Sequence, residues 1–166
     1  MKILGKRSLS SGIRNGLIIL LIIAILITIS VGAWIILEWE MWMENILNKT
    51  IAIAYLSSFP VIVMVVQFIK IFQNLKNEKA FEKENTKSLK ISYIASFIIC
   101  AIYLINTIII LANEKLDIFN SSIVYPILMG VIATVFFFFG IGLLVLTEIY
   151  KKAIQFKEEN ELTLLY

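Results

Sequence analysis

The chain has 166 residues, of which 60% are apolar and 16% are charged, and its formal net charge is +3. Soluble domains average about 45–50% apolar and about 25% charged residues, so this composition excludes an ordinary water-soluble protein. The single cysteine, Cys100, excludes an intramolecular disulfide, and the absence of histidine removes the commonest metal ligand and the side chain best suited to proton transfer near neutral pH.

The first apolar segment, residues 17–37, contains no charged side chain and is long enough to cross a bilayer as a helix. A cleaved signal peptide is the alternative, because a basic stretch precedes the segment and Val31 with Ala33 resembles a small-residue cleavage site. The apolar stretch, however, exceeds the usual signal-peptide core of about 7–15 residues. We therefore expect an uncleaved signal anchor.

Three further apolar segments follow, at residues 51–72, 91–112 and 123–146. As helices they are long enough for a hydrocarbon core of about 30 Å, and continuous apolar runs lack the alternation of a membrane β-barrel. We predict an all-α polytopic membrane protein, one domain over residues 1–166, with four transmembrane helices in an antiparallel bundle. Pro60 predicts a bend in the second helix, and Ser57 and Ser58 are expected to bond the freed backbone groups.

Basic residues are distributed unevenly between these segments. Of the 15 Lys and Arg residues, only Lys49 and Lys115 lie in the first and third connections; the others lie in the N-terminal segment, around the loop 73–90 and in the tail 147–166. Because cytoplasmic loops carry the excess of Lys and Arg, we predict that both termini and the loop 73–90 lie in the cytoplasm. Helix-forming residues after 146 predict that the fourth helix extends into the cytoplasm to about Glu159.

Local signals add two expectations. Asn85 or Thr86 is expected to be the N-cap of the third helix, because their side-chain oxygens can accept from unpaired backbone N–H groups. The abundance of Ile, Lys and Asn hints at an AT-rich bacterial genome, so the predicted location is the plasma membrane of a bacterium.

Candidate chemistry is sparse. The apolar segments hold no deep ionisable side chain, and the sequence has no phosphate loop, zinc motif or serine nucleophile elbow, so we predict no enzyme, no cofactor and no catalytic or metal-binding residue. The amides of Gln67 and Asn106 are expected to hydrogen-bond between helices, with a substrate contact as the alternative. The basic loop attracts anionic headgroups, but its interspersed glutamates argue against a specific lipid or nucleic-acid site.

Two predicted cytoplasmic segments are distinctive: LKNEKAFEKENTKSLKISYIA at 75–95 and LTEIYKKAIQFKEENELTL at 146–164. They resemble the paired signatures of a family of small bacterial four-helix membrane proteins, the domain of unknown function 2975. The resemblance covers nearly the whole chain. The matching residues of the loop are Phe81, Glu84, Asn85 and Leu89, and those of the tail are Glu148, Glu158, Glu159, Leu162 and Thr163.

The family has no settled activity. Its members are often encoded beside a small helix-turn-helix regulator, so the resemblance implies a membrane component that signals to, or sequesters, such a partner. Our leading hypothesis is a non-enzymatic membrane protein whose cytoplasmic loop and tail pack together and bind a protein partner, without direct contact to nucleic acid. The alternatives are a small transporter, channel or toxin-immunity protein acting as an oligomer, and a structural subunit of a larger membrane complex.

Overall fold

The computed structural model describes the backbone of residues 9–40, 46–113 and 124–163, and the side chains of 9–40, 51–112 and 124–160. All regular structure in these ranges is helical: α1 (Leu9–Leu37), α3 (Ile46–Tyr55), α4 (Ser58–Lys76), α5 (Lys83–Asn113) and α6 (Val124–Thr163). Four stretches are long and apolar enough to cross a membrane, namely Leu9–Leu37, Ile51–Lys76, Lys83–Ala112 and Val124–Asn160. The prediction of an all-α protein with four membrane-spanning helices is therefore confirmed.

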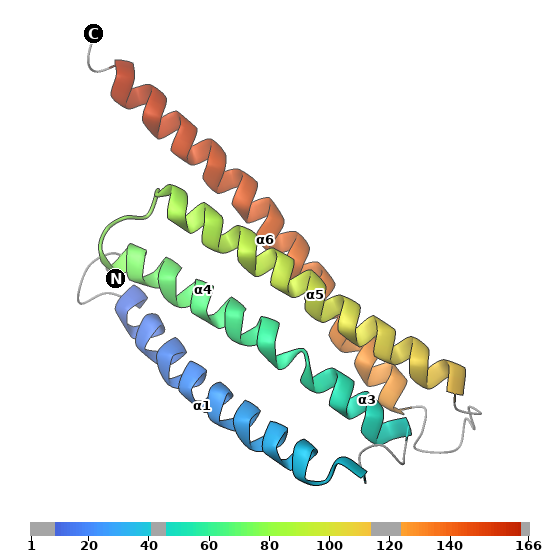
Figure 1. The fold of residues 1–166 in the computed structure, drawn as a ribbon. Coiled ribbons are helices and arrows are strands. Elements are labelled where there is room, and N and C mark those ends of the chain that lie inside the picture. Colours follow the sequence, from blue (N-terminus) through green and yellow to red (C-terminus); the bar gives the residue numbers. More distant parts are fainter. Residues whose placement is uncertain (1–8, 41–45, 114–123, 164–166) are drawn as a thin grey trace.

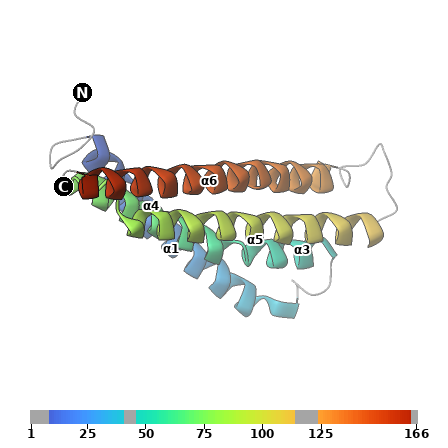
Figure 2. The ribbon, with the colours of Figure 1, turned by 90° about the horizontal axis from the view of Figure 1, so that it is seen from above.

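The long helices lie side by side in chain order, with α3 and α4 forming one interrupted rod (Figure 1). Cross-helix contacts link the start of α1 to the end of α4 through Arg14 and Gln73, and the start of α5 to the end of α6 through Lys83 and Glu158. Successive helices therefore run in opposite directions. One end of the bundle holds the starts of α1 and α5 and the ends of α4 and α6 (Figures 1 and 2). We call it the loop end.

The second spanning segment is broken where the sequence predicts a bend. Because Pro60 has no N–H, the carbonyl of Leu56 cannot receive the usual helical hydrogen bond. The chain instead turns at Leu56 and Ser57, whose N–H groups donate to the carbonyls of Ile53 and Ala54 at 3.0 and 2.9 Å. The serines do not re-satisfy the backbone as expected: the Ser57 hydroxyl donates to the Tyr103 hydroxyl at 3.3 Å, and the buried Ser58 hydroxyl has no partner.

The closest packing lies between α5 and α6, where small side chains allow the backbones to approach. Ser92, Ser96 and Ala133 are almost completely buried, and the Ser96 hydroxyl donates to the Phe136 carbonyl at 2.7 Å. Apolar clusters continue this interface toward α4: one is built on Met64, Ala95 and Ile99, and the other on Ile71, Leu89 and Leu143. In lipid, the hydrophobic effect does not bring apolar helices together, because the acyl chains are as apolar as the side chains. Such close packing is therefore the main source of cohesion within the bundle.

On the opposite side of α4, α1 forms the edge of the bundle. Tyr55 on α3 donates its hydroxyl to the Thr28 carbonyl at 2.8 Å, and a Cβ atom at Gly32 would lie only 2.4 Å from that hydroxyl oxygen. A side chain at position 32 would therefore have to displace the Tyr55 hydroxyl from this position. The outer faces carry exposed apolar side chains such as Ile36 and Leu37, as expected for helices surrounded by lipid.

Two helix boundaries differ from the sequence-based expectations. The helix α5 begins at Lys83, so Asn85 and Thr86 lie in its first turns, and the prediction that one of them is the N-cap is wrong. The helix α6 continues to Thr163, several residues beyond the predicted end at Glu159. In both cases polar helix extends past the apolar segment, because charged helix-forming residues favour the helix once a neighbouring helix supports it.

Candidate functional site

The loop that joins α4 to α5 starts with a defined helix end. The N–H of Lys79 donates to the carbonyl of Asn74 at 2.9 Å, and that of Glu78 to the carbonyl of Leu75 at 3.1 Å. These two bonds define the Schellman motif, in which the first residue after the helix cap, here Glu78, adopts the left-handed conformation. Glu78 has a φ of 62° there, a conformation that costs a residue with a Cβ about 1–2 kcal/mol. The chain turns sharply at this point because the bonds outweigh that strain.

Asn85 then fixes the rest of the loop. Its side chain is fully buried, accepts a hydrogen bond from the Asn74 amide at 2.8 Å, and donates to the carbonyls of Lys79 and Ala80 at 3.0 and 2.7 Å. A buried amide with three partners is fully engaged, and removing it would leave the carbonyls of Lys79 and Ala80 without these donors. Asn85 thus holds the end of α4, the loop and the start of α5 together.

The loop packs against the end of α6. The rings of Phe81 and Tyr150 lie with their centroids 6.1 Å apart, and the Lys83 ammonium lies 2.9 Å from the Glu158 carboxylate. Both charged side chains are more than half exposed, so this pair contributes at most about 1 kcal/mol. The buried Ile154 supplies the apolar part of the contact. The loop and the tail segment of α6 therefore form one continuous surface.

A groove runs between α5 and α6 on this surface. It has a volume of about 440 Å³, with a smaller hollow of about 240 Å³ beside it at Phe81 and Glu82. Basic side chains dominate the groove, and the Thr86 hydroxyl beneath it is buried without a hydrogen-bond partner. We call it the loop–tail groove; its lining residues are Lys83, Thr86, Lys87, Lys90, Lys151, Ile154, Gln155 and Glu158.

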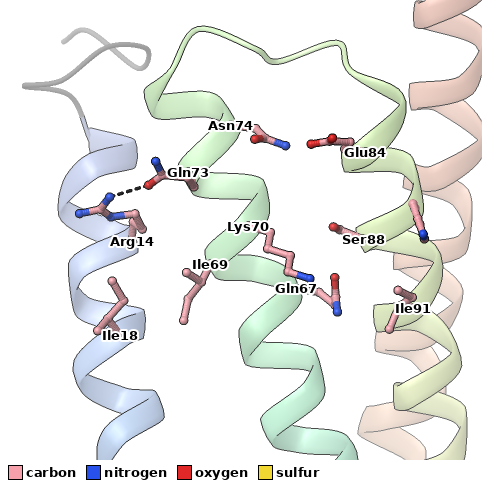
Figure 3. A pocket seen from close by; sticks show the side chains of 11 residues that line it. Arg14, Ile18, Gln67, Ile69, Lys70, Gln73, Asn74, Glu84, Ser88 and Ile91 are labelled. Carbon is pink, nitrogen blue, oxygen red and sulfur yellow. Dashed lines mark hydrogen bonds between the residues drawn. The ribbon is translucent and has the colours of Figure 1, made fainter.

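The structure separates the residues that the sequence proposed for docking. Phe81 and Glu158 lie at the loop–tail groove or the hollow beside it, and Glu159 is exposed nearby in sequence. Asn85 and Leu89 are buried and hold the fold together, so they are not available to a partner. Glu84 points to the other side of α5 (Figure 3). Leu162 and Thr163 belong to the last turn of α6, and their side chains lie outside the described residues.

Sequence reasoning missed the basic rim of this groove. Lys83, Lys87 and Lys90 recur on one face of α5 at helical spacing, and Lys151, Gln155 and Glu158 do the same on α6. That spacing is a signal that the sequence carried. The pairing of the two faces, in contrast, depends on how α5 and α6 are rotated about their axes.

A second pocket, of about 480 Å³, lies at the loop end between α1, α4 and α5 (Figure 3). Arg14 reaches it from α1 and donates a hydrogen bond to Oε1 of Gln73 on α4. Lys70 and Gln67 extend from α4 toward α5, where Ser88 faces them (Figure 3). Side chains from three helices therefore converge on one space, which we call the three-helix pocket. Nothing in the local sequence around Arg14 indicates that it contacts α4 and lines a pocket with α5.

The two intramembrane amides do not form the predicted bonds between helices. Asn106 is 0% exposed, and neither its amide nitrogen nor its oxygen has a hydrogen-bond partner in the part of the chain that the structure describes. Gln67 is only 7% exposed and lines the three-helix pocket, and within the described residues it also forms no hydrogen bond. Asn106 is therefore buried without the bonds that normally accompany burial, whereas Gln67 lines the three-helix pocket.

Among comparisons with known proteins, only a family model based on sequence matches the chain. Neither curated proteins nor solved structures gave a match. Within the described residues, no cluster of three or more His, Cys, Asp or Glu side chains could hold a metal ion. The family described as "Protein of unknown function (DUF2975)" matches residues 34–164, which is most of the chain and includes both distinctive segments. The chain therefore belongs to this family, as its loop and tail signatures indicated.

Proposed function

We propose that this chain is a non-enzymatic, regulatory membrane protein of a bacterial plasma membrane, and that it binds a soluble cytoplasmic protein in the loop–tail groove. The observation that carries the proposal is the groove itself, in which the buried Ile154 is bordered by lysines from two helices. Such a site fits an amphipathic helix that places an apolar side chain against Ile154 and acidic side chains beside the lysines. A small helix-turn-helix regulator, which the family resemblance suggests, is a partner of suitable size.

Charge complementarity supports a protein with an acidic segment. The groove presents Lys83, Lys87, Lys90 and Lys151, whereas among the described residues that line it only Glu158 has a carboxylate, and this is already paired with Lys83. Opposite charge across an interface mainly raises the association rate and selects the partner. The extension of α6 beyond the apolar segment supplies half of this surface, which gives the extension a role that spanning the membrane does not require.

Photo-crosslinking in intact cells tests the groove. A photoreactive phenylalanine at Gln155 lies in the groove, whereas the same group at Phe156, which is 65% exposed, lies about 100° further around α6 and away from it. We expect one soluble protein to be captured from position 155 and not from position 156. Capture from position 156 alone would move the binding face to the other side of α6 and contradict the proposal.

Charge reversal provides a second, independent measurement on the captured protein. Lys90→Glu changes the groove, and Lys152→Glu makes the same change of charge on an exposed residue of α6 that does not line it. We expect Lys90→Glu to weaken binding at least about fivefold, since a well-placed surface charge contributes roughly 1 kcal/mol. Equal weakening by both variants would indicate a general charge effect rather than a groove.

A further inference from the structure

We infer that the three-helix pocket binds the phosphate-bearing headgroup of an anionic phospholipid. The pocket lies at the loop end, where Arg14 precedes the apolar part of α1, Lys70 lies near the end of that of α4, and Lys87 precedes that of α5. This is the depth at which lipid phosphates lie beside membrane-spanning helices. The inference does not depend on the protein partner proposed above.

The cations of the pocket lack counter-ions. Within the described residues, Arg14 and Lys70 take part in no ion pair. Among the described residues that line the pocket, Glu84 alone has a carboxylate, and it is exposed at the rim. Lys87 lines both this pocket and the loop–tail groove and adds to the positive charge between them. The excess of positive charge favours an anion.

Arg14 is held in place for this purpose. Its guanidinium donates to Oε1 of Gln73 and to Oδ1 of Asn15, which are neutral acceptors. These bonds orient the guanidinium at the boundary of α1 and α4 without neutralising its charge. A planar guanidinium fixed in this way can bind phosphate oxygens, and less entropy is lost on binding than with a free side chain.

The deep part of the pocket presents a polar side chain. Gln67 is only 7% exposed, forms no hydrogen bond within the described residues, and lies beside Lys70 facing Ser88 (Figure 3). An amide that lines a pocket without a protein partner can bond a ligand there. A phosphate or glycerol oxygen of a headgroup at this point would accept from the Gln67 amide.

The shape of the lining favours a lipid over a free phosphate ion. Gln73, Asn74 and Glu84 lie toward the loop, whereas Ile18, Ile69 and Ile91 lie further along the helices (Figure 3). A phospholipid has the same order, with a polar headgroup above acyl chains. Apolar side chains beside the cations would contact the start of an acyl chain, and an inorganic ion would gain nothing from them.

Native mass spectrometry of the full-length protein in detergent tests the inference, with phosphatidylglycerol, phosphatidylcholine and inorganic phosphate as separate probes. We expect phosphatidylglycerol to be retained more strongly than phosphatidylcholine, and Lys70→Gln or Arg14→Gln to weaken its retention about fivefold each. Lys79→Gln removes an exposed cation from the same end of the protein but not from the pocket, and should leave retention unchanged. Inorganic phosphate that binds and is lost with Lys70→Gln would assign the pocket to a free anion instead of a lipid. Equal retention of both lipids, or equal loss with Lys79→Gln, would overturn the inference.

Thermal unfolding separates binding from a structural role of Gln67. Gln67→Leu removes the amide from the pocket, so we expect an unfolding temperature in lipid-free detergent no lower than that of the native protein, and a smaller increase on adding phosphatidylglycerol. If Gln67 served only to hold helices together, the variant would unfold at a lower temperature without lipid, and the increase with phosphatidylglycerol would be unchanged. That pair of results would count against the pocket as a lipid site.

Discussion

The ring of Phe97 on α5 lies so close to the backbone of Gly140 on α6 that a Cβ atom at position 140 would be 3.0 Å from Cε1 of that ring. Phe97 has little freedom to move, because its ring also contacts those of Tyr93 and Phe137. The largest helix interface therefore depends on the absence of a side chain at one position. This relationship leads to the first prediction.

Gly140→Leu is expected to destabilise the bundle by about 1–3 kcal/mol, because the new side chain must displace Phe97 or separate α5 from α6. Gly142→Leu is the matched control, since a Cβ atom at position 142 meets no heavy atom within 4 Å. Thermal unfolding of the two purified variants in the same detergent measures the difference. Equal unfolding temperatures would show that the contact at position 140 does not limit packing.

Asn85→Ala is expected to loosen the loop between α4 and α5, because it removes one acceptor and two donor interactions that hold Asn74, Lys79 and Ala80. The loss of a buried polar partner costs about 1–3 kcal/mol. Trypsin should then cleave after Lys79 or Lys83 faster than in the native protein, and the rate can be followed by mass spectrometry. Asn77→Ala, at an exposed position in the same turn, should leave the cleavage rate unchanged. Similar rates for both variants would contradict the role given to Asn85.

Asn106→Leu is expected to stabilise the protein by at most about 1–3 kcal/mol, because it removes a buried amide whose two polar atoms have no partner within the described residues, while the larger Leu side chain must fit at a fully buried position. Asn106→Asp should have the opposite effect, since it can place a charge at the same buried position. Unfolding temperatures in detergent report both changes. A liposome flux assay adds a separate readout: solute movement that Asn106→Leu abolishes would favour the transporter alternative over a docking protein.

The predicted orientation can be measured with single thiols. Cys100 is buried and should react slowly, so the native chain gives a low background. With a membrane-impermeant maleimide, Glu38→Cys should react in intact cells, whereas Asn77→Cys should react only after the membrane is opened; both positions are exposed. Reaction of Asn77→Cys in intact cells would place the loop outside and would reverse the predicted topology.

The sequence did not predict which side chains on different helices contact each other. The helical spacing of Lys83, Lys87 and Lys90 was present in the sequence, but the position of the facing helix was not. Asn85 was expected to cap a helix through its local bonding capacity; in the fold it bonds a neighbouring helix and the loop instead. Asn106 was expected to bond across helices, but its buried amide has no hydrogen-bond partner within the described residues. Each outcome depends on rotations of whole helices, which no local pattern specifies.

The sequence by itself determined that four segments prefer lipid, that Pro60 interrupts the second of them, and that the loop and tail carry the signatures of the family. These properties depend on neighbouring residues in the chain, through their transfer free energies and their backbone constraints. They do not depend on contacts with residues far away in the sequence. Only the tertiary structure decided that Arg14 meets Gln73, that Gly140 receives Phe97, and that cations from three helices share one pocket. Those contacts join residues far apart in the chain, so they follow from the mutual packing of helices and not from any single segment.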